Sequence, residues 1–278
     1  MEIKVLGTVS PYCKDDKNCP GYLIRGNKTK VLLDCGNGVT RNLKLPDDLE
    51  NLNIIISHLH KDHYGDLLSL AYATYVFHNL GYLQERVKVY IPEPNMYQVS
   101  EGYTDDDGWG ASRLVKKPLI DYEFLQNLGE EHYFELIPYN ENTKIEFEDL
   151  NISFSKNPHQ VNTYSTKVVD KDKTFVYSGD TGYQGNSLVR LAEDADILLC
   201  EATFLRGQTR LTDNHLYAYE AAKIAKQANV RQLVLTHFFP EIDKELYVQE
   251  ARTIFENTDA AEEGKILKLG GIKWVNQD

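Results

Sequence analysis

The sequence has no hydrophobic run long enough to cross a membrane. The longest nearly apolar stretch, Leu67 to Phe77, is too short to span a bilayer and contains serine, tyrosine and threonine. The first residues, Met1 to Gly7, are typical of a β-strand and not of a signal peptide. We therefore expect a cytoplasmic protein with no membrane-bound part.

Cysteine is scarce, and no Cys-x-x-Cys spacing occurs among the four cysteines, at positions 13, 19, 35 and 200. In a reducing compartment this pattern predicts free thiols. Cys13 and Cys19 flank a charged, turn-rich segment, so two alternatives stay open for them. They could pair as a disulfide, or they could hold a structural metal ion.

Positive charge is also limited, since 30 Lys and Arg residues stand against 42 Asp and Glu residues, a net charge of −12. This balance argues against a broad electrostatic contact with nucleic acid. It allows a small anionic substrate held by metal cations, because a bound ion dominates the field in its own site.

No low-complexity linker divides the 278 residues, so we expect a single domain over 1–278. Short apolar strands recur along the chain, and helical patterns cover 66–80, 217–228 and about 243–256. Residues 93–135 give the weakest pattern. There, Trp109 in the acidic turn 105–110 is a candidate for covering a pocket, the alternative being a solvated charged face.

Ligand-type side chains are densest directly after the apolar strand 54–56, at His58, His60, Asp62 and His63. Imidazole and carboxylate are the groups that zinc and similar ions prefer. The first two histidines can face one ion, and the following pair can face a second as a helix begins. A polar loop without chemistry is the alternative, but chance rarely produces this pattern after a buried strand. The motif therefore predicts metal binding.

Four apolar strands end in ligand-type residues, namely His58, Asp180, Glu201 and His237. In layered α/β folds, polar groups at strand ends line one edge of a sheet, where sites are built. Asp34 also follows a strand, and two roles stay open for it. It could orient a ligating histidine, or it could satisfy backbone donors in its own turn.

Together these residues resemble the metallo-β-lactamase superfamily. The resemblance spans 58–237 and is carried by His58-x-His60-x-Asp62-His63, the isolated His159, Asp180 in Ser-Gly-Asp, and His237 in Leu-Thr-His. It implies an α/β (α+β) fold of four layers, an αββα sandwich with metals at one edge between the sheets. It also implies a hydrolase.

The resemblance implies two divalent ions, most commonly Zn²⁺, with Mn²⁺ or Fe as alternatives. The first ion would be bound by His58, His60 and His159, the second by Asp62, His63 and His237, and both by Asp180. A water or hydroxide between the ions would be the nucleophile, its pKa lowered by the metals. Asp62 is expected to be catalytic as well as a ligand.

Within the superfamily, the closer resemblance is to the ribonuclease Z-like phosphodiesterase branch. It rests on Glu201-Ala202-Thr203-Phe204, on Asn214-His215, and on the helix that leads to Leu235-Thr236-His237-Phe238. It implies that His215, oriented by Glu201, donates a proton to the leaving group or contacts the transition state. The alternative is that Glu201 caps a helix and His215 is a polar residue at its start.

Two departures argue against tRNA as the substrate. First, the sequence lacks a Gly/Pro-rich, basic insertion of the kind that forms a tRNA-binding arm. Second, Phe238-Phe239-Pro240 stands where a serine and Arg-Tyr usually follow the last histidine. We therefore expect hydrolysis of a phosphodiester bond in a small anionic molecule such as a cyclic nucleotide. Carboxylic ester, lactone, sulfate or thioester bonds are the alternatives.

Two other classes of protein share the fold. A diiron oxidoreductase usually carries an acidic residue at the position of His60 and needs a flavin-bearing partner domain. A binding module that has lost its metals would lack ligands, whereas all seven are present here. Dimers are frequent in this branch, so a homodimer is a further expectation.

Overall fold

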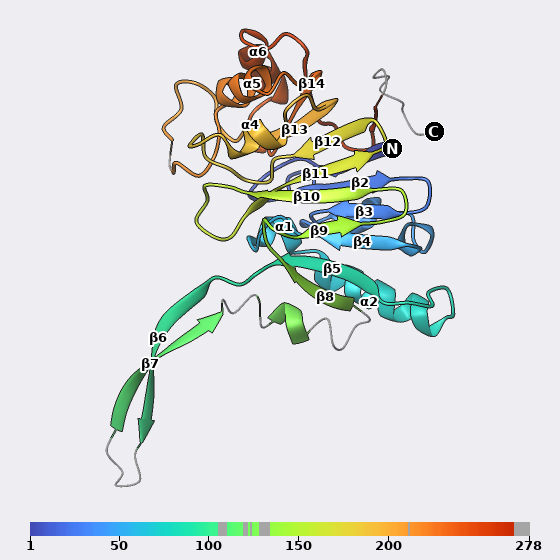
Figure 1. Ribbon diagram of the computed structural model, residues 1–278, viewed down its shortest axis with the longest axis vertical. Helices are drawn as coiled ribbons and strands as arrows, with labels where there is room; N and C mark the ends of the chain where they lie inside the picture. Colours follow the sequence, from blue (N-terminus) through green and yellow to red (C-terminus); the bar gives the residue numbers. More distant parts are fainter. Residues whose placement is uncertain (105–109, 119–121, 123, 128–133, 211, 270–278) are drawn as a thin grey trace.

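The computed structural model describes residues 1–104, 110–118, 122, 124–127, 134–210 and 212–269. Two seven-stranded mixed sheets lie face to face, and helices cover their outer faces (Figure 1). This is the predicted four-layer αββα arrangement. The prediction of one domain over 1–278 stays a prediction.

The first sheet has the order β16-β1-β2-β3-β4-β5-β8. Its strands are β16 (Ile266–Lys268), β1 (Glu2–Gly7), β2 (Gly21–Arg25), β3 (Lys30–Leu33), β4 (Leu52–Ile55), β5 (Val87–Pro92) and β8 (Phe134–Tyr139). Strands β3, β4, β5 and β8 are parallel. The same half of the fold contains the short helices η1 (Val39–Asn42), η2 (Asp47–Leu49) and α1 (Lys61–Tyr64), and the longer α2 (Leu67–Asn79).

The second sheet has the order β15-β14-β13-β12-β11-β10-β9. Its strands are β15 (Thr258–Ala260), β14 (Gln232–Thr236), β13 (Ile197–Glu201), β12 (Lys173–Tyr177), β11 (Tyr164–Asp170), β10 (Asn151–Lys156) and β9 (Lys144–Glu146). Its outer helices are α4 (Ser187–Leu191), α5 (Ala218–Gln227) and α6 (Lys244–Arg252). The helices expected at 66–80, 217–228 and 243–256 are thus present as α2, α5 and α6. No helix among the described residues is long and apolar enough to cross a membrane.

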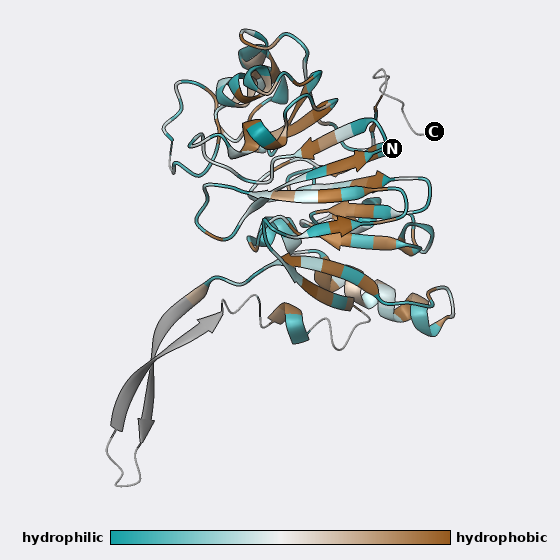
Figure 2. Cartoon of the chain, viewed as in Figure 1, coloured by the Kyte–Doolittle hydropathy of each residue, from teal (hydrophilic) through white to brown (hydrophobic). Residues whose placement is uncertain are grey.

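Three apolar clusters hold the four layers together. Leu199 lies in the cluster between the two sheets, whereas its neighbour Leu198 packs in the cluster that contains Ala221 of α5. On the first sheet, Ile54 and Leu70 share the cluster under α2. Successive strand residues point to opposite faces, and both faces are buried here. This explains the apolar runs in the strands, which Figure 2 shows as brown segments.

A separate hairpin of β6 (Met96–Thr104) and β7 (Gly110–Pro118) extends away from the two sheets (Figure 1). Neither these strands nor an arm is predictable from the sequence, because residues 93–135 show no clear hydrophobic alternation. The segment 96–118 contains three basic residues and four acidic ones, so this arm is not a basic one. Trp109 lies outside the described residues, and its predicted covering role stays a prediction.

Candidate metal centre

The candidate site is built where parallel strands of both sheets end. Strand β4 leads into the loop that carries His58, and β12 leads to Asp180. Strand β13 ends at Glu201, and β14 ends one residue before His237. Helix α1 begins after His60 and contributes its own first-turn residues to the same edge.

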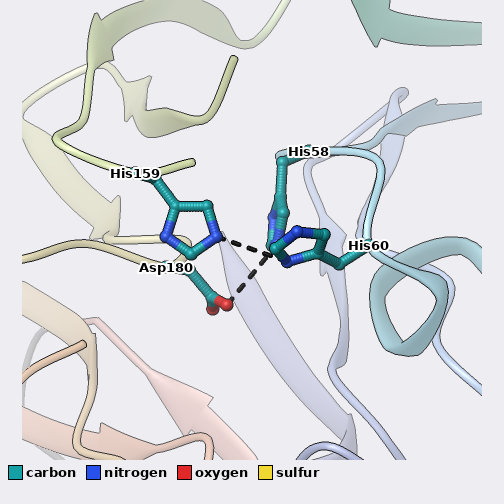
Figure 3. A group of neighbouring side chains, drawn as sticks. All are labelled: His58, His60, His159 and Asp180. Atoms are coloured by element: carbon teal, nitrogen blue, oxygen red, sulfur yellow. Dashed lines mark hydrogen bonds and ion pairs between the residues drawn. The ribbon is translucent and has the colours of Figure 1, made fainter. Parts of the chain in front are cut away.

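One cluster consists of His58, His60, His159 and Asp180, whose potential ligand atoms all lie within 4.8 Å of one another. Figure 3 shows these four side chains converging, with His58 and His60 on one loop and His159 and Asp180 on other segments of the chain. His159 Nε2 is 3.3 Å from His60 Nδ1, and His58 Nε2 is 3.5 Å from Asp180 Oδ2. This is the set predicted for the first ion.

A second cluster consists of Asp62, His63 and His237, again with potential ligand atoms within 4.8 Å of one another. Asp180 Oδ1 lies 3.3 Å from His63 Nε2 and 3.1 Å from His237 Nε2. Asp180 therefore touches both clusters, as expected for a bridging ligand. All seven predicted ligands are brought to one place.

When both rings are neutral, as metal ligation requires, the hydrogen bonds behind the second cluster leave two imidazole lone pairs facing each other. His63 Nδ1 is 2.7 Å from Asp34 Oδ2, so the proton of the neutral ring belongs on Nδ1. Thr203 Oγ1 donates to Glu201 and lies 2.9 Å from His237 Nδ1, which must then carry a proton too. The two Nε2 atoms, 3.2 Å apart, are both left as acceptors. A cation between them removes this repulsion.

The same logic applies to His58. Ser57 Oγ donates to Asp34 Oδ2 over 2.9 Å, so it accepts from His58 Nδ1 at 3.0 Å. His58 Nε2 is buried and has no hydrogen-bond partner among the described residues. A buried acceptor of this kind is costly unless a ligand satisfies it. These donors fit divalent zinc-like ions well.

Asp34 takes the first of the two roles that the sequence left open, because it faces a candidate ligand, and the backbone donor that it satisfies belongs to Ser57 and not to its own turn. Its carboxylate is fully buried and accepts the Ser57 backbone N–H at 2.6 Å, and it also faces His63 Nδ1. The Tyr177 hydroxyl donates to the same carboxylate over 2.7 Å. Asp34 thus orients a predicted ligand while it ties the two sheets together below the site.

The electrostatics of the two clusters suit a bound cation. Burial lowers the pKa of His58 well below its usual range, and burial together with His159 lowers the pKa of His60 to about 4, so both rings are neutral at pH 7. Burial disfavours the charged form of His63, but the carboxylates of Asp180, Asp62 and Asp34 together raise its pKa well above the usual value. The surroundings of His63 therefore favour a positive charge, which a divalent cation also supplies.

Glu201 and His215 form a pair beside these clusters. Glu201 Oε1 is 3.0 Å from His215 Nδ1, and Glu201 is almost fully buried. The Thr181 and Thr203 backbone N–H groups donate to the same carboxylate. Burial opposes charge on His215, but the Glu201 carboxylate raises the pKa of His215 to about 9.

The alternative in which Glu201 caps the helix after His215 is wrong, although His215 does lie just before that helix. The N-cap of α5 is Tyr217, which forms a capping box with Glu220, so neither Glu201 nor His215 caps that helix. Sequence reasoning missed Thr203 as a bridge between Glu201 and His237, although it lies only two residues after Glu201.

It also missed Ser10, whose hydroxyl donates to Asp62 Oδ2 over 2.7 Å. The two residues are far apart in the sequence, and nothing in the pattern around Ser10 indicates this contact.

Comparison with known proteins agrees with this geometry. Residues 29–238 match the family model described as the beta-lactamase superfamily domain. Since this match covers most of the chain, the protein belongs to that family. The fold and the candidate ligand set define the class of protein, a metallo-hydrolase of the β-lactamase fold.

The chain is 27% identical over 256 residues to the probable metallo-hydrolase YhfI of Bacillus subtilis, covering 92% of this chain and 94% of that protein. It is 26% identical over 292 residues to ribonuclease Z of Chlamydia muridarum, covering 94% of this chain and 95% of that protein. The crystal structure of YhfI superposes with a TM-score of 0.77 at 25% identity, covering 96% of this chain and 99% of that one.

Proposed function

We propose that this protein is a binuclear metallohydrolase that cleaves a phosphodiester bond in a small anionic substrate. The observation that carries the proposal is the Glu201–His215 pair, placed beside a complete set of seven candidate ligands. His215 Nδ1 lies 3.8 Å from Asp180 Oδ2, so a proton donor stands next to the centre of the ligand set.

Two divalent ions, with Zn²⁺ the first choice and Mn²⁺ or Fe the alternatives, would supply a hydroxide nucleophile and neutralise substrate charge when bound by these ligands. His215 holds the proton that the leaving group needs. Its Nδ1–H donates a hydrogen bond to Glu201, so its second nitrogen, Nε2, is the one that gives its proton to the leaving group. The side chain is 20% exposed, which lets solvent return the proton after product release.

Leaving-group protonation favours phosphodiesters as substrates. An alkoxide leaving group is a strong base, and a positioned general acid contributes about 10²–10⁴-fold to its departure. The imidazolium and the cations also stabilise the charge that an anionic ester develops in its transition state. A cyclic nucleotide has both the charge and the bond that this site requires.

The β6–β7 arm supports a small molecule over tRNA. Folded RNA is held mainly through many phosphate contacts to Lys and Arg. The segment 96–118 has three basic against four acidic residues, and the chain as a whole has a net charge of −12. We place this hydrolase in the cytoplasm, in keeping with its four free cysteines.

The direct test is hydrolysis of bis(p-nitrophenyl) phosphate by protein reconstituted with Zn²⁺ or Mn²⁺, with a chelator-treated sample as the control. Chelator-sensitive turnover, followed by turnover of a cyclic nucleotide, is the expected result. If two ions are bound and no phosphodiester is cleaved, the bond assignment is wrong. Carboxylic, sulfate and thioester substrates would then be tested.

We further propose that the hydrolase is a homodimer joined through helix α2. Six of the large hydrophobic residues exposed among the described residues lie on α2 or just after it, namely Leu68, Tyr72, Tyr75, Val76, Leu80 and Tyr82. Residues 67–83 contain no charged side chain, although 26% of the chain is charged. A second copy fits this face, because two chains of net charge −12 approach most easily where neither is charged, and a twofold axis pairs a surface with itself.

A further inference from the structure

Cys13 and Cys19 lie close together in a short loop before β2. Their sulfur atoms are 3.7 Å apart, and both are free thiols. Lys14 and Lys17 exchange two backbone hydrogen bonds between them, which closes a tight turn. The main chain therefore holds the two cysteines together.

The two thiols differ in exposure. Cys13 is exposed, whereas Cys19 is fully buried. The Asn37 carbonyl accepts both the Cys13 thiol, at 3.0 Å, and the Cys19 backbone N–H, at 3.0 Å. Cys19 also packs tightly against Gly36, where an added Cβ would lie 2.8 Å from its own Cβ. The buried thiol is thus fixed, and the exposed one is accessible to a dissolved oxidant.

We propose that Cys13 and Cys19 form an intramolecular disulfide when the protein meets a peroxide. The peroxide oxidises the Cys13 thiol to a sulfenic acid and releases one water. The Cys19 sulfur then attacks the Cys13 sulfur, the S–O bond breaks, and a second water leaves with the thiol proton. Two electrons pass from the two thiols to the peroxide, so no other reactant is needed.

A structural metal site is the competing use of these thiols. Among the residues that the structure describes, no third histidine, cysteine or carboxylate groups with Cys13 and Cys19. Two ligands alone do not make a structural zinc site, which needs four. The geometry therefore favours the disulfide of the two alternatives.

The pair is connected to the second ligand cluster, and this part of the inference rests on the proposed function. Ser10, three residues before Cys13, donates to Asp62 over 2.7 Å. Tyr12 donates to Glu241 over 3.2 Å, close to His237 in the chain. Because a disulfide is about 2.0 Å long, closure draws the sulfurs together by roughly 1.7 Å, mostly by moving Cys13. We infer that closure disturbs Ser10 and weakens metal binding at Asp62.

The first experiment treats the reduced full-length protein with hydrogen peroxide and measures intact mass and a peptide map. The expected result is a loss of about 2 Da, a link between residues 13 and 19, and reversal by dithiothreitol. The buried Cys35 and Cys200 stay as thiols and are the internal control. In Cys19→Ser, a sulfenic acid on Cys13 should be trapped by dimedone, and in Cys13→Ser no adduct should form.

Oxidation of Cys13 to a sulfinic acid in the wild-type protein, a link between two chains, or no change in mass would overturn the disulfide. The second experiment compares zinc affinity of oxidised and reduced protein by chelator competition, and we expect about tenfold weaker binding after oxidation. Equal affinities would overturn the connection between the disulfide and Asp62, and the disulfide itself would stand. Neither readout needs turnover, so failure of the proposed hydrolase activity is distinguishable from failure of this inference.

Discussion

Thr203 and His237 are joined by a contact of 2.9 Å between the threonine hydroxyl and the histidine Nδ1. The same hydroxyl donates to Glu201 over 2.9 Å. One small side chain therefore connects the candidate proton-donating pair with a candidate metal ligand. His237 has a left-handed backbone conformation (φ 62), so its side chain does not point as it would in a regular strand. The hydroxyl of Thr203 fixes the orientation of the His237 ring.

Replacing Thr203 by valine keeps the shape and removes both hydrogen bonds. We expect zinc affinity and kcat each to fall about 10- to 100-fold, as is usual for partners that orient a metal ligand. Thr203→Ser restores the hydroxyl and should recover most of the loss. Chelator competition and initial rates measure the two effects, and unchanged zinc affinity in Thr203→Val would contradict the orienting role.

His58→Ala should reduce the bound metal from about two ions per chain to about one or none, and abolish activity. The reason is that His58 presents a buried Nε2 with no hydrogen-bond partner among the described residues, and a bound cation would satisfy it. Elemental analysis of the purified protein measures the change. His78→Ala, on α2 and away from the ligand set, is the control, and full metal content in both variants would show that His58 is not a ligand.

His215→Ala should keep both metal ions but lose about 10²–10⁴-fold in kcat toward a phosphodiester with a poor leaving group. A substrate with a p-nitrophenolate leaving group should lose much less, because that group departs without a proton. The ratio of the two rates is the measurement. Equal losses on both substrates would rule out the acid role of His215.

The pH dependence follows from the pKa of His215, which the Glu201 carboxylate raises to about 9 against the effect of burial. The acid must be protonated, so kcat should fall as the pH rises through about 9, and His215 sets this alkaline limb of the profile. In Glu201→Gln the raising charge is gone, and the fall should move toward 6.5, the ordinary imidazole value. A pH–rate profile of both proteins checks this, and an unshifted profile would dismiss Glu201 as the cause.

The proposed dimer should dissociate when charge is placed on α2. Leu68→Glu combined with Val76→Glu puts two like charges per chain on a face that would meet itself. We expect the sedimentation coefficient to fall from the dimer to the monomer value, with the circular dichroism unchanged. Leu246→Glu on α6 is a matched control, since Leu246 is 48% exposed and outside this face. A monomeric wild-type protein would refute the proposal.

The sequence alone was sufficient for the family and the layers, and it named the seven side chains that the structure brings together. His58, His60, Asp62 and His63 lie within six residues, so their common target follows from local spacing. The apolar runs before His58, Asp180, Glu201 and His237 predict strands whose polar ends line one edge of a sheet. Strand β15 was missed, because Thr258–Ala260 is too short and polar to show a pattern.

The tertiary structure alone decided how the ligands are supported. Asp34 faces His63 and Ser57 as well as Tyr177 of the other sheet, and Ser10 reaches Asp62 across 52 positions of sequence. Such contacts depend on how the two sheets pack against each other, and the hydrophobic periodicity of the sequence does not contain this information. The β6–β7 arm and the uncharged outer face of α2 have the same origin. A strand pattern shows which residues are buried, but what an element contacts is determined only when the layers assemble.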